Sequence, residues 1–269
     1  MYRRPPANAT ILIPVKLPIV KHQQHLEDVL VRSLARVNLA LQTGDVLAIA
    51  SKVVSIAEGA VVDLARLEVT KKAVQIARRW HLRAQLAALV LQEADAVLGG
   101  VKGFLLTSKD GIMTANAGVD LKNTPRGMAV RWPNNPDKTA VTLRKTLERK
   151  FRARLGVIIV DSRVTPMRLG TVGLAIGSSG IAAVRDYRGV HDLFGRKIRV
   201  TQSAVIDDLA SCAHLLMGEA GERVGAVVIA RAPVELDRRS DSRFAHLDMD
   251  RCLIASNLRA VSGAGQLRG

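Results

Sequence analysis

The sequence predicts an α+β protein, and three observations support this class. Apolar residues recur at helical spacing in some segments and form short continuous runs in others, so the chain contains both helices and strands. These segments follow one another without the regular strand–helix–strand alternation of a doubly wound parallel sheet. The chain has 269 residues, which is enough to bury a sizeable core in one large domain or two small ones.

The N-terminal half is expected to begin with a strand and continue mainly through helices. Pro14 and Pro18 interrupt the first apolar run, which predicts a short strand and then a loop, because proline removes a ladder donor. Thr43-Gly44 and Gly99-Gly100 are interpreted as helix ends. The expected elements are a strand within 10–20, a helix over 26–41, a buried strand over 45–50, and helices at about 70–79 and 82–98.

The second half contains the clearest strands. Lys109-Asp110-Gly111 between two apolar runs predicts a hairpin. The expected elements are strands near 102–107 and 112–117, a long loop over 125–136, a helix over 143–155, a buried strand over 156–161, an apolar segment over 172–176, a helix over 204–217, a strand over 224–230 and a weaker helical stretch near 247–259.

The chain is strongly basic, with 40 Lys and Arg against 24 Asp and Glu and a net charge of +16. This charge favours a polyanionic partner or a phosphorylated substrate. Only 3% of the residues are aromatic, which disfavours a stacking surface for single-stranded nucleic acid. The basic side chains of the helix over 143–155 fit either a solvated face or a polyanion contact.

Other features narrow the class of protein. No apolar run approaches the ~20 residues of a membrane span, and the N-terminus lacks the apolar core of a secretory signal, so we expect a cytoplasmic protein without membrane contact. Cys212 and Cys252 exclude a disulfide framework and are interpreted as buried thiols. The six histidines are scattered and are interpreted as ordinary surface or core residues.

No common nucleotide-binding or hydrolase motif is present, but small polar residues follow several strands and one helix. Asp and Asn also initiate turns, and Gly also ends helices, so each segment alone fits a structural role. Together they offer the oxygen ligands that Mg²⁺ and Mn²⁺ prefer, which could bridge nucleotide phosphates. The segments are 116–120 with Asn123, Asp161-Ser162, and 217–222.

Nine short segments, taken in register, carry a resemblance to a known family. They are 17–21, 44–47, 50–55 leading to 57–59, 116–120 with Asn123, 156–162, 168–170, 175–177, 192–196 and 216–219. Together they make the chain resemble the coenzyme F420-0:L-glutamate ligase family from about residue 13 to residue 232.

The resemblance implies a fold and a reaction. The fold is α+β, with two intertwined lobes of mixed or antiparallel sheets and packed helices, and members form homodimers. Residues 10–232 are expected to form this domain, with 1–9 and 233–269 as terminal extensions. Members use GTP and a divalent metal to join L-glutamate to the lactyl phosphate side chain of a deazaflavin, through an acyl phosphate. The implied partners are therefore GTP, L-glutamate and a deazaflavin phosphodiester, and the implied ions are Mg²⁺ or Mn²⁺ at two sites and a monovalent cation such as K⁺.

Site residues follow from the same resemblance. Asp120 and Asp161 would be catalytic and would hold one metal ion, and Ser162, where threonine is usual, would hold the second with Glu219. The residues implied to line the GTP site are Leu17, Pro18, Ile19, Val20, Ser51, Lys52, Asn123, Met217, Gly218, Glu219, Ala220, Gly221, Glu222, Arg223 and Val224.

Two positions depart from the family pattern. Ile56 stands where the family usually has a lysine that contacts the nucleotide, and an isoleucine supplies neither charge nor donor. Residues 163–166 lack the usual glycine and arginine, and Arg163 or Lys52 is a candidate replacement for the lost charge. Two alternatives stay open: a divergent homologue that acts on another phosphorylated acid or lacks ligase activity, and a basic nucleic-acid-binding protein.

Overall fold

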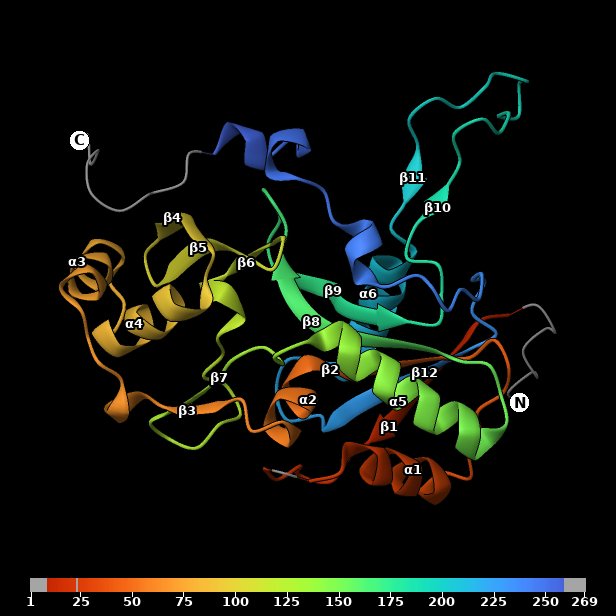
Figure 1. Ribbon diagram of the computed structural model, residues 1–269, viewed down its shortest axis with the longest axis horizontal. Helices are drawn as coiled ribbons and strands as arrows, with labels where there is room; N and C mark the ends of the chain where they lie inside the picture. The colour runs from red at the N-terminus through yellow and green to blue at the C-terminus, as the bar shows by residue number, and fades with distance from the viewer. Residues whose placement is uncertain (1–8, 23, 259–269) are drawn as a thin grey trace. The chain divides into compact units, whose positions relative to one another are not determined.

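The computed structural model describes residues 9–22 and 24–258 and shows a mixed arrangement of helices and several sheets, which confirms the α+β class (Figure 1). The described residues gather in two compact units, between which the chain passes repeatedly. Unit 1 comprises residues 9–22, 24–58, 133–165 and 170–245, and unit 2 comprises residues 59–132, 166–169 and 246–258.

A five-stranded sheet is the centre of unit 1. Its strands, in spatial order, are β1 (Ile11–Lys16), β12 (Val224–Ala230), β2 (Val46–Ala50), β8 (Gly156–Val164) and β9 (Thr171–Ser179). The neighbours β2 and β8 run parallel, and the other pairs are antiparallel. Pro14 lies in β1, at the edge of the sheet, where a missing N–H interrupts no internal ladder.

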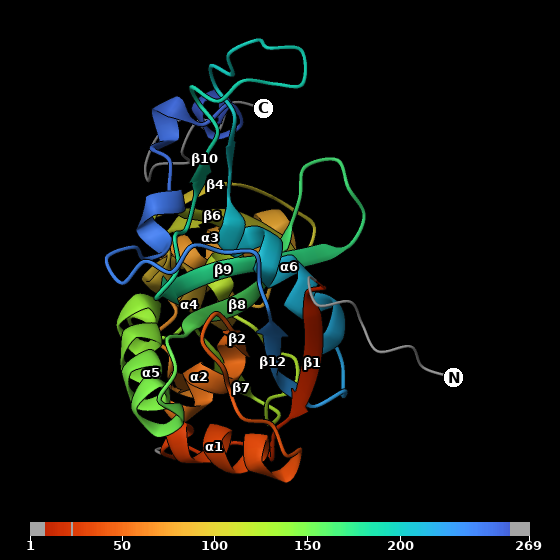
Figure 2. The same cartoon turned by 90° about the vertical axis from the view of Figure 1, so that its right-hand side faces the viewer.

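Helices cover both faces of this sheet (Figures 1 and 2). They are α1 (Leu26–Arg36), α2 (Ser51–Ala57), α5 (Pro136–Phe151) and α6 (Val205–Met217). Helix α6 packs on Ala48, Ile158, Val160 and Ala175, which form one apolar face of the sheet. Pro136 of α5 packs against Gly177 on β9, where an added Cβ would lie 2.5 Å from the proline, so this site needs glycine for close approach.

Unit 2 combines a helix pair with small antiparallel sheets. Its elements are β3 (Val61–Asp63), η1 (Leu64–Arg66), α3 (Lys71–Trp80), α4 (Ala84–Glu93), β4 (Ala96–Val101), β5 (Phe104–Lys109), β6 (Ile112–Ala115), η2 (Asn116–Gly118) and β7 (Met128–Val130). Strands β4, β5 and β6 form one sheet, and β3 pairs with β7. The expected hairpin between β5 and β6 is confirmed, because Asp110 and Gly111 both have positive φ, as a type I′ turn requires.

Several sequence expectations were wrong at element boundaries. Helix α1 ends at Arg36 instead of 41, because Asn38 adopts φ 51° and the N–H of Leu39 bonds back to the carbonyl of Leu34. Helix α4 ends at Glu93, and Gly99-Gly100 lies inside β4. At Gly100 an added Cβ would lie 2.7 Å from the Trp80 ring, so this glycine permits close packing within a strand.

Other expectations also need correction. The loop over 125–136 contains strand β7, and the stretch near 247–259 contains only the short turns η4 (Met249–Arg251) and η5 (Ala255–Asn257), with residue 259 outside the described residues. Arg144 is buried, not solvated. Cys212 is exposed and Cys252 is partly exposed, so neither is a buried thiol.

The expected extensions lie partly outside the described residues, since residues 1–8 and 259–269 are not described. Residues 233–245 pack within unit 1: the backbone N–H of Ala183 donates to Ser240 Oγ at 3.0 Å, and Ser242 Oγ donates to Asp137 at the same distance. The turn η3 (Ser242–Ala245) ends this segment. Within the described residues, no helix is long and apolar enough to cross a membrane.

A long hairpin arm extends from unit 1 between β10 (Arg185–Asp186) and β11 (Gln202–Ser203) (Figures 1 and 2). At its base, hydrogen bonds from the Arg188 side chain and backbone lower the pKa of Asp186 to about 2. At its tip, Asp192 accepts hydrogen bonds from the backbone N–H groups of Phe194 and Arg196, both at 2.8 Å. The arm is therefore an ordered turn, although its side chains are exposed.

Candidate functional site

Asp161 and Ser51 meet where the parallel strands β2 and β8 end their pairing. The register aligns Ala50 with Val160, so Ser51 and Asp161 are the next residues on the two chains. The Ser51 hydroxyl donates to Asp161 Oδ1 at 3.0 Å, and Ser51 is buried. Because the strands upstream are buried apolar runs, they hold the carboxylate in a fixed position at this edge of the sheet.

Ser162 lies on the opposite face of the sheet from Asp161, because successive side chains of a strand alternate. Ser162 pairs with Gly173 on β9, and Thr171 lies two residues before Gly173, so Ser162 and Thr171 share this face. Helix α6 packs here, since the Ser211 hydroxyl donates to the carbonyl of Gly173 at 3.0 Å.

Glu219 follows the end of α6 on the same side as Ser162. The Thr171 hydroxyl donates to Glu219 Oε1 at 2.6 Å, and His214 Nε2 lies 3.0 Å from the same oxygen. Sequence reasoning missed both neighbours, because His214 is separated from Glu219 by the helix end and Thr171 by 48 residues. The carboxylate is thus placed near the start of β9 by a hydroxyl and an imidazole.

Two of the segments implied to bind GTP lie side by side in unit 1. Strand β1 pairs with β12 as far as Lys16 and Val224, and the N–H of Leu17 then donates to the carbonyl of Arg223 at 3.1 Å. Leu17 is buried, whereas Ile19 is 79% exposed. This hydrogen bond therefore places the start of segment 17–20 beside the end of segment 217–224.

The turn over 217–224 has a defined backbone. Gly218 ends α6 with φ 70°, and Glu222 Oε2 accepts a hydrogen bond from the backbone N–H of Ala220 at 2.8 Å. Arg223 has φ 60°, which is uncommon for a residue with a Cβ. This turn presents backbone groups instead of continuing the helix, which is a suitable arrangement for contacting a phosphate.

The candidate residues of unit 2 follow a tight left-handed turn. Asn116, Ala117 and Gly118 all have positive φ, and buried Asn116 accepts a hydrogen bond from the N–H of Leu105 at 2.8 Å. Thr107 Oγ1 accepts another from the N–H of Ala117 at 2.8 Å. These bonds fix a backbone conformation that costs free energy for residues other than glycine.

Asp120 is anchored directly after this turn. Its backbone exchanges hydrogen bonds with Val130 at 2.8 and 2.9 Å, and its Oδ1 accepts from the N–H of Lys122 at 2.7 Å. Asn123 is exposed and has φ 54°. Asp120 and Asn123 belong to unit 2, whereas Asp161, Ser162 and Glu219 belong to unit 1, so convergence of the two sets stays a prediction.

The donor atoms of the candidate site fit a hard divalent cation in type. The side chains of Asp161, Ser162 and Glu219 offer only oxygen, and Thr171 adds another hydroxyl beside Glu219. Mg²⁺ and Mn²⁺ take such ligands and complete their shells with water and substrate phosphates. Among the described residues, no group of three or more His, Cys, Asp or Glu gathers at one point.

The fold and these oxygen donors define an α+β protein whose candidate residues suit a hard divalent cation. The chain matches the F420-0:Gamma-glutamyl ligase family over residues 14–231. It therefore belongs to this family and is an amide-bond-forming ligase.

Individual relatives agree with this assignment. The chain is 37% identical over 226 residues to the coenzyme F420:L-glutamate ligase of Methanocaldococcus jannaschii, covering 83% of this chain and 88% of the relative. It is 40% identical over 206 residues to the same-named protein of Methanopyrus kandleri, with 76% and 82% covered. The protein of that name in Archaeoglobus fulgidus is 37% identical over 219 residues, with 81% and 86% covered.

Proposed function

We propose that this protein is a GTP- and divalent-metal-dependent ligase that joins L-glutamate to the lactyl phosphate side chain of coenzyme F420-0. The observation that carries the proposal is the family match over residues 14–231, which spans both units. The placement of Asp161 on β8, where its pairing with β2 ends, beside the hydroxyl of Ser51, supports a role in binding a cation.

The proposed reaction has two steps, because a carboxylate is a poor acyl donor until one oxygen becomes part of a leaving group. First, the acceptor carboxylate oxygen attacks the γ-phosphorus of GTP, the bond to the β-phosphate oxygen breaks, and GDP leaves. Next, the amine of L-glutamate attacks the acyl carbon. Inorganic phosphate then leaves and the nitrogen loses a proton, which gives the amide.

The oxygen donors of both units would hold the cations. Asp120 and Asp161 would hold one ion, and Ser162 and Glu219 would hold the second. Bound Mg²⁺ or Mn²⁺ would neutralise the charge of the transferring phosphoryl group. The Ser51 hydroxyl orients Asp161, and Thr171 and His214 orient Glu219, so these residues are positioning residues. A monovalent cation such as K⁺ is a further proposed component.

The nucleotide would lie along the joined segments 17–20 and 217–224, with Ser51, Lys52 and Asn123 as further contacts. The hydrogen bond between Leu17 and Arg223 supports this, because it places the two segments next to each other. L-glutamate and the deazaflavin phosphodiester would be the other two substrates.

We further propose that the protein is a homodimer. The support is the arm between β10 and β11, where large apolar side chains are exposed at an ordered turn: Val190 at 51%, Leu193 at 100%, Phe194 at 88% and Val200 at 83%. Such side chains on an extended arm are typical of a surface that a second copy covers.

A divergent homologue is the second candidate, and one position favours it. Ile56 on α2 cannot replace the charge of the usual family lysine. In that case the chain would keep the fold but act on another phosphorylated acid, or would have lost the ligase reaction.

The reaction can be tested directly with purified protein, GTP, Mn²⁺, F420-0 and L-glutamate. We expect release of GDP and phosphate, and a product heavier by one glutamyl residue in mass spectrometry, with no turnover in EDTA. Asp161→Asn should abolish turnover while the folded structure persists, because the residue lies just beyond the part of β8 that pairs with β2. Asp28→Asn, on the exposed side of α1, is the matched control and should keep full activity.

Two results would contradict the proposal. An unchanged rate in Asp161→Asn would exclude this carboxylate from the reaction. Absence of turnover with GTP and with ATP, in protein that binds neither nucleotide in the presence of Mn²⁺, would favour the divergent homologue.

A further inference from the structure

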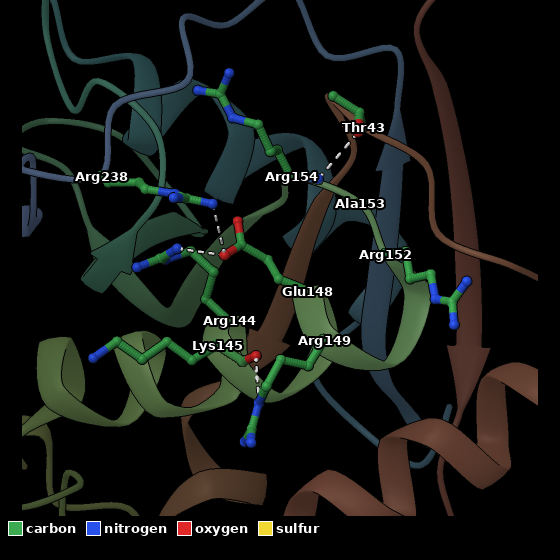
Figure 3. A pocket seen from close by; sticks show the side chains of 9 residues that line it. All are labelled: Thr43, Arg144, Lys145, Glu148, Arg149, Arg152, Ala153, Arg154 and Arg238. Atoms are coloured by element: carbon green, nitrogen blue, oxygen red, sulfur yellow. Dashed lines mark hydrogen bonds and ion pairs between the residues drawn. The ribbon is translucent and has the colours of Figure 1, made fainter.

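A cationic hollow of about 620 Å³ lies on unit 1, away from the candidate site (Figure 3). Six cationic side chains and one carboxylate line it. They are Arg144, Lys145, Arg149, Arg152, Arg154, Arg238 and Glu148, with Thr43 and Ala153 completing the wall.

The hollow lies at the opposite ends of the strands from Asp161. Thr43 precedes β2 and Arg154 precedes β8, and the N–H of Arg154 donates to Thr43 Oγ1 at 3.1 Å. Ser51 and Asp161 follow the paired parts of the same two strands. Because β2 and β8 run parallel, the hollow lies at the N-terminal ends of these two strands, and Ser51 and Asp161 lie at the C-terminal end of their pairing.

The single carboxylate is already fully engaged. Glu148 Oε2 accepts from Arg144 at 2.7 Å and from Arg238 at 3.4 Å, and Oε1 accepts from the N–H of Leu155 at 3.1 Å. Arg144 is only 5% exposed and also donates to Ser179 Oγ at 2.9 Å. Glu148 and buried Arg144 therefore form a fixed floor, and the more exposed Arg238 contacts Glu148 from one side (Figure 3).

The remaining four cations surround this floor and are exposed. Arg149 donates to the Lys145 carbonyl at 3.3 Å and to Thr146 Oγ1 at 3.5 Å. Within the described residues, no carboxylate forms an ion pair with Lys145, Arg149, Arg152 or Arg154. The C-terminal end of α5 accounts for some of this charge through the helix dipole, but its effect is limited to the last turn and does not include Arg154.

We propose that this hollow binds a compact polyphosphate group, such as a free triphosphate or the triphosphate tail of a nucleotide. Guanidinium groups bind phosphate oxygens through paired, charge-assisted hydrogen bonds, and several flexible cations can close around one multiply charged anion. The volume suits a small ligand. No aromatic side chain lines the hollow, so it offers no ring on which bases of a nucleic acid could stack.

Equilibrium dialysis of the whole protein with inorganic triphosphate tests the site. EDTA is present throughout, so that metal-dependent binding at the candidate active site does not contribute. We expect saturable binding of one triphosphate per chain, weakened at least about tenfold by Arg149→Ala/Arg154→Ala. The control Lys71→Ala/Lys72→Ala removes two exposed cations of α3 and should bind as the unaltered protein does.

Further arms identify the chemistry and separate this site from the proposed reaction. GTP should compete with triphosphate and guanosine should not, and Asp161→Asn should bind triphosphate normally. The proposal is overturned if binding does not saturate, if both double variants weaken it equally, or if guanosine competes. A further result would also overturn the proposal: an RNA duplex displaces triphosphate, and the same duplex binds the α3 control variant more weakly than the unaltered protein. That pattern indicates diffuse attraction to a basic surface.

Discussion

Arg163 lies two residues beyond Asp161 on β8, so strand alternation gives both side chains the same face of the sheet. Its Nε is buried, and within the described part of the chain it has no hydrogen-bond partner. A buried guanidinium N–H without an acceptor is costly unless a ligand supplies one. We infer that Arg163 donates to a substrate phosphate. Its charge would then replace that of the usual family lysine, whose position is occupied here by Ile56.

This inference predicts a loss and a rescue. Arg163→Ala should weaken GTP binding about tenfold, because a hydrogen bond to a charged group contributes about 1.5–3 kcal/mol. Ile56→Lys places a cation on α2, beside the strand that carries Asp161, and should restore part of the affinity in the double variant. Titration calorimetry with Mn²⁺ measures both effects. An unchanged affinity in folded Arg163→Ala would show that the orphan N–H is only a feature of the packing.

At the same scale, the sequence predicts which residues belong to the candidate site better than it predicts which residues they hydrogen-bond. Asp161 could be predicted because a buried apolar run directly precedes it, which is a local signal. Its bond to Ser51 could not, because the two residues lie 110 positions apart and only the parallel register of β2 and β8 joins them. The burial of Arg144 was missed for the same reason, since its partner Ser179 lies on a distant strand.

At the scale of elements, the packing of α6 on β9 determines where Glu219 lies. A Cβ on Gly173 would lie 2.2 Å from the carbonyl oxygen of Ala210 and 2.8 Å from the Cβ of His214. The glycine is therefore required for space between strand and helix. Because α6 carries His214 and leads into Glu219, a displaced helix would also move this carboxylate away from Thr171.

Gly173→Ala should accordingly lower both stability and activity. We expect the free energy of unfolding to fall by about 1–3 kcal/mol, since a backbone carbonyl cannot move aside as a side chain end can. Urea unfolding and kcat/KM measure the two effects. Gly99→Ala, on β4 and outside the candidate site segments, is the control, because nothing lies within 4 Å of its added Cβ. Equal stability of the two variants would show that α6 moves away from β9 at little cost.

Elements with strong local patterns were predicted well, and those that depend on packing were not. Strand β12 was expected over the residues where it occurs, because its apolar run is continuous and bounded by polar residues. The end of α4 was misplaced because Gly99-Gly100 was interpreted as a helix end, whereas Gly100 serves close contact with Trp80. Strand β7 was missed because three residues paired with a distant strand leave no periodic signal.

At the scale of the whole molecule, the candidate residues are divided between two units, and the proposed reaction needs both sets. Asp120 is fixed by a turn and a bridge in unit 2, and Asp161 by parallel strands in unit 1. Each carboxylate is fixed within its own unit, so the proposed shared metal ion requires the two to converge. The sequence resemblance predicts their convergence, but neither local pattern could have done so.

The arm between β10 and β11 carries the exposed apolar side chains on which the proposed homodimer rests. Leu193 and Phe194 are almost fully exposed on a turn that Asp192 holds in place with two backbone hydrogen bonds. Exposed apolar side chains on an ordered turn gain stability when a second copy covers them, by about 1.5–3 kcal/mol for each large side chain. The double variant Leu193→Ser/Phe194→Ser should therefore weaken dimerisation at least about a hundredfold.

Analytical ultracentrifugation over a range of concentrations measures this change. The unaltered protein should sediment at twice the 29.0 kDa of one chain, and the double variant should shift to the single mass at concentrations where the unaltered protein stays dimeric. Leu215→Ser, on an exposed position of α6, is the matched control and should leave the mass unchanged. A monomeric unaltered protein, or a double variant that keeps the dimer mass, would show that the arm serves another purpose. The paired hydrogen bonds of Asp192 remain in the double variant, because the N–H of residue 194 belongs to the backbone, so the turn itself should persist.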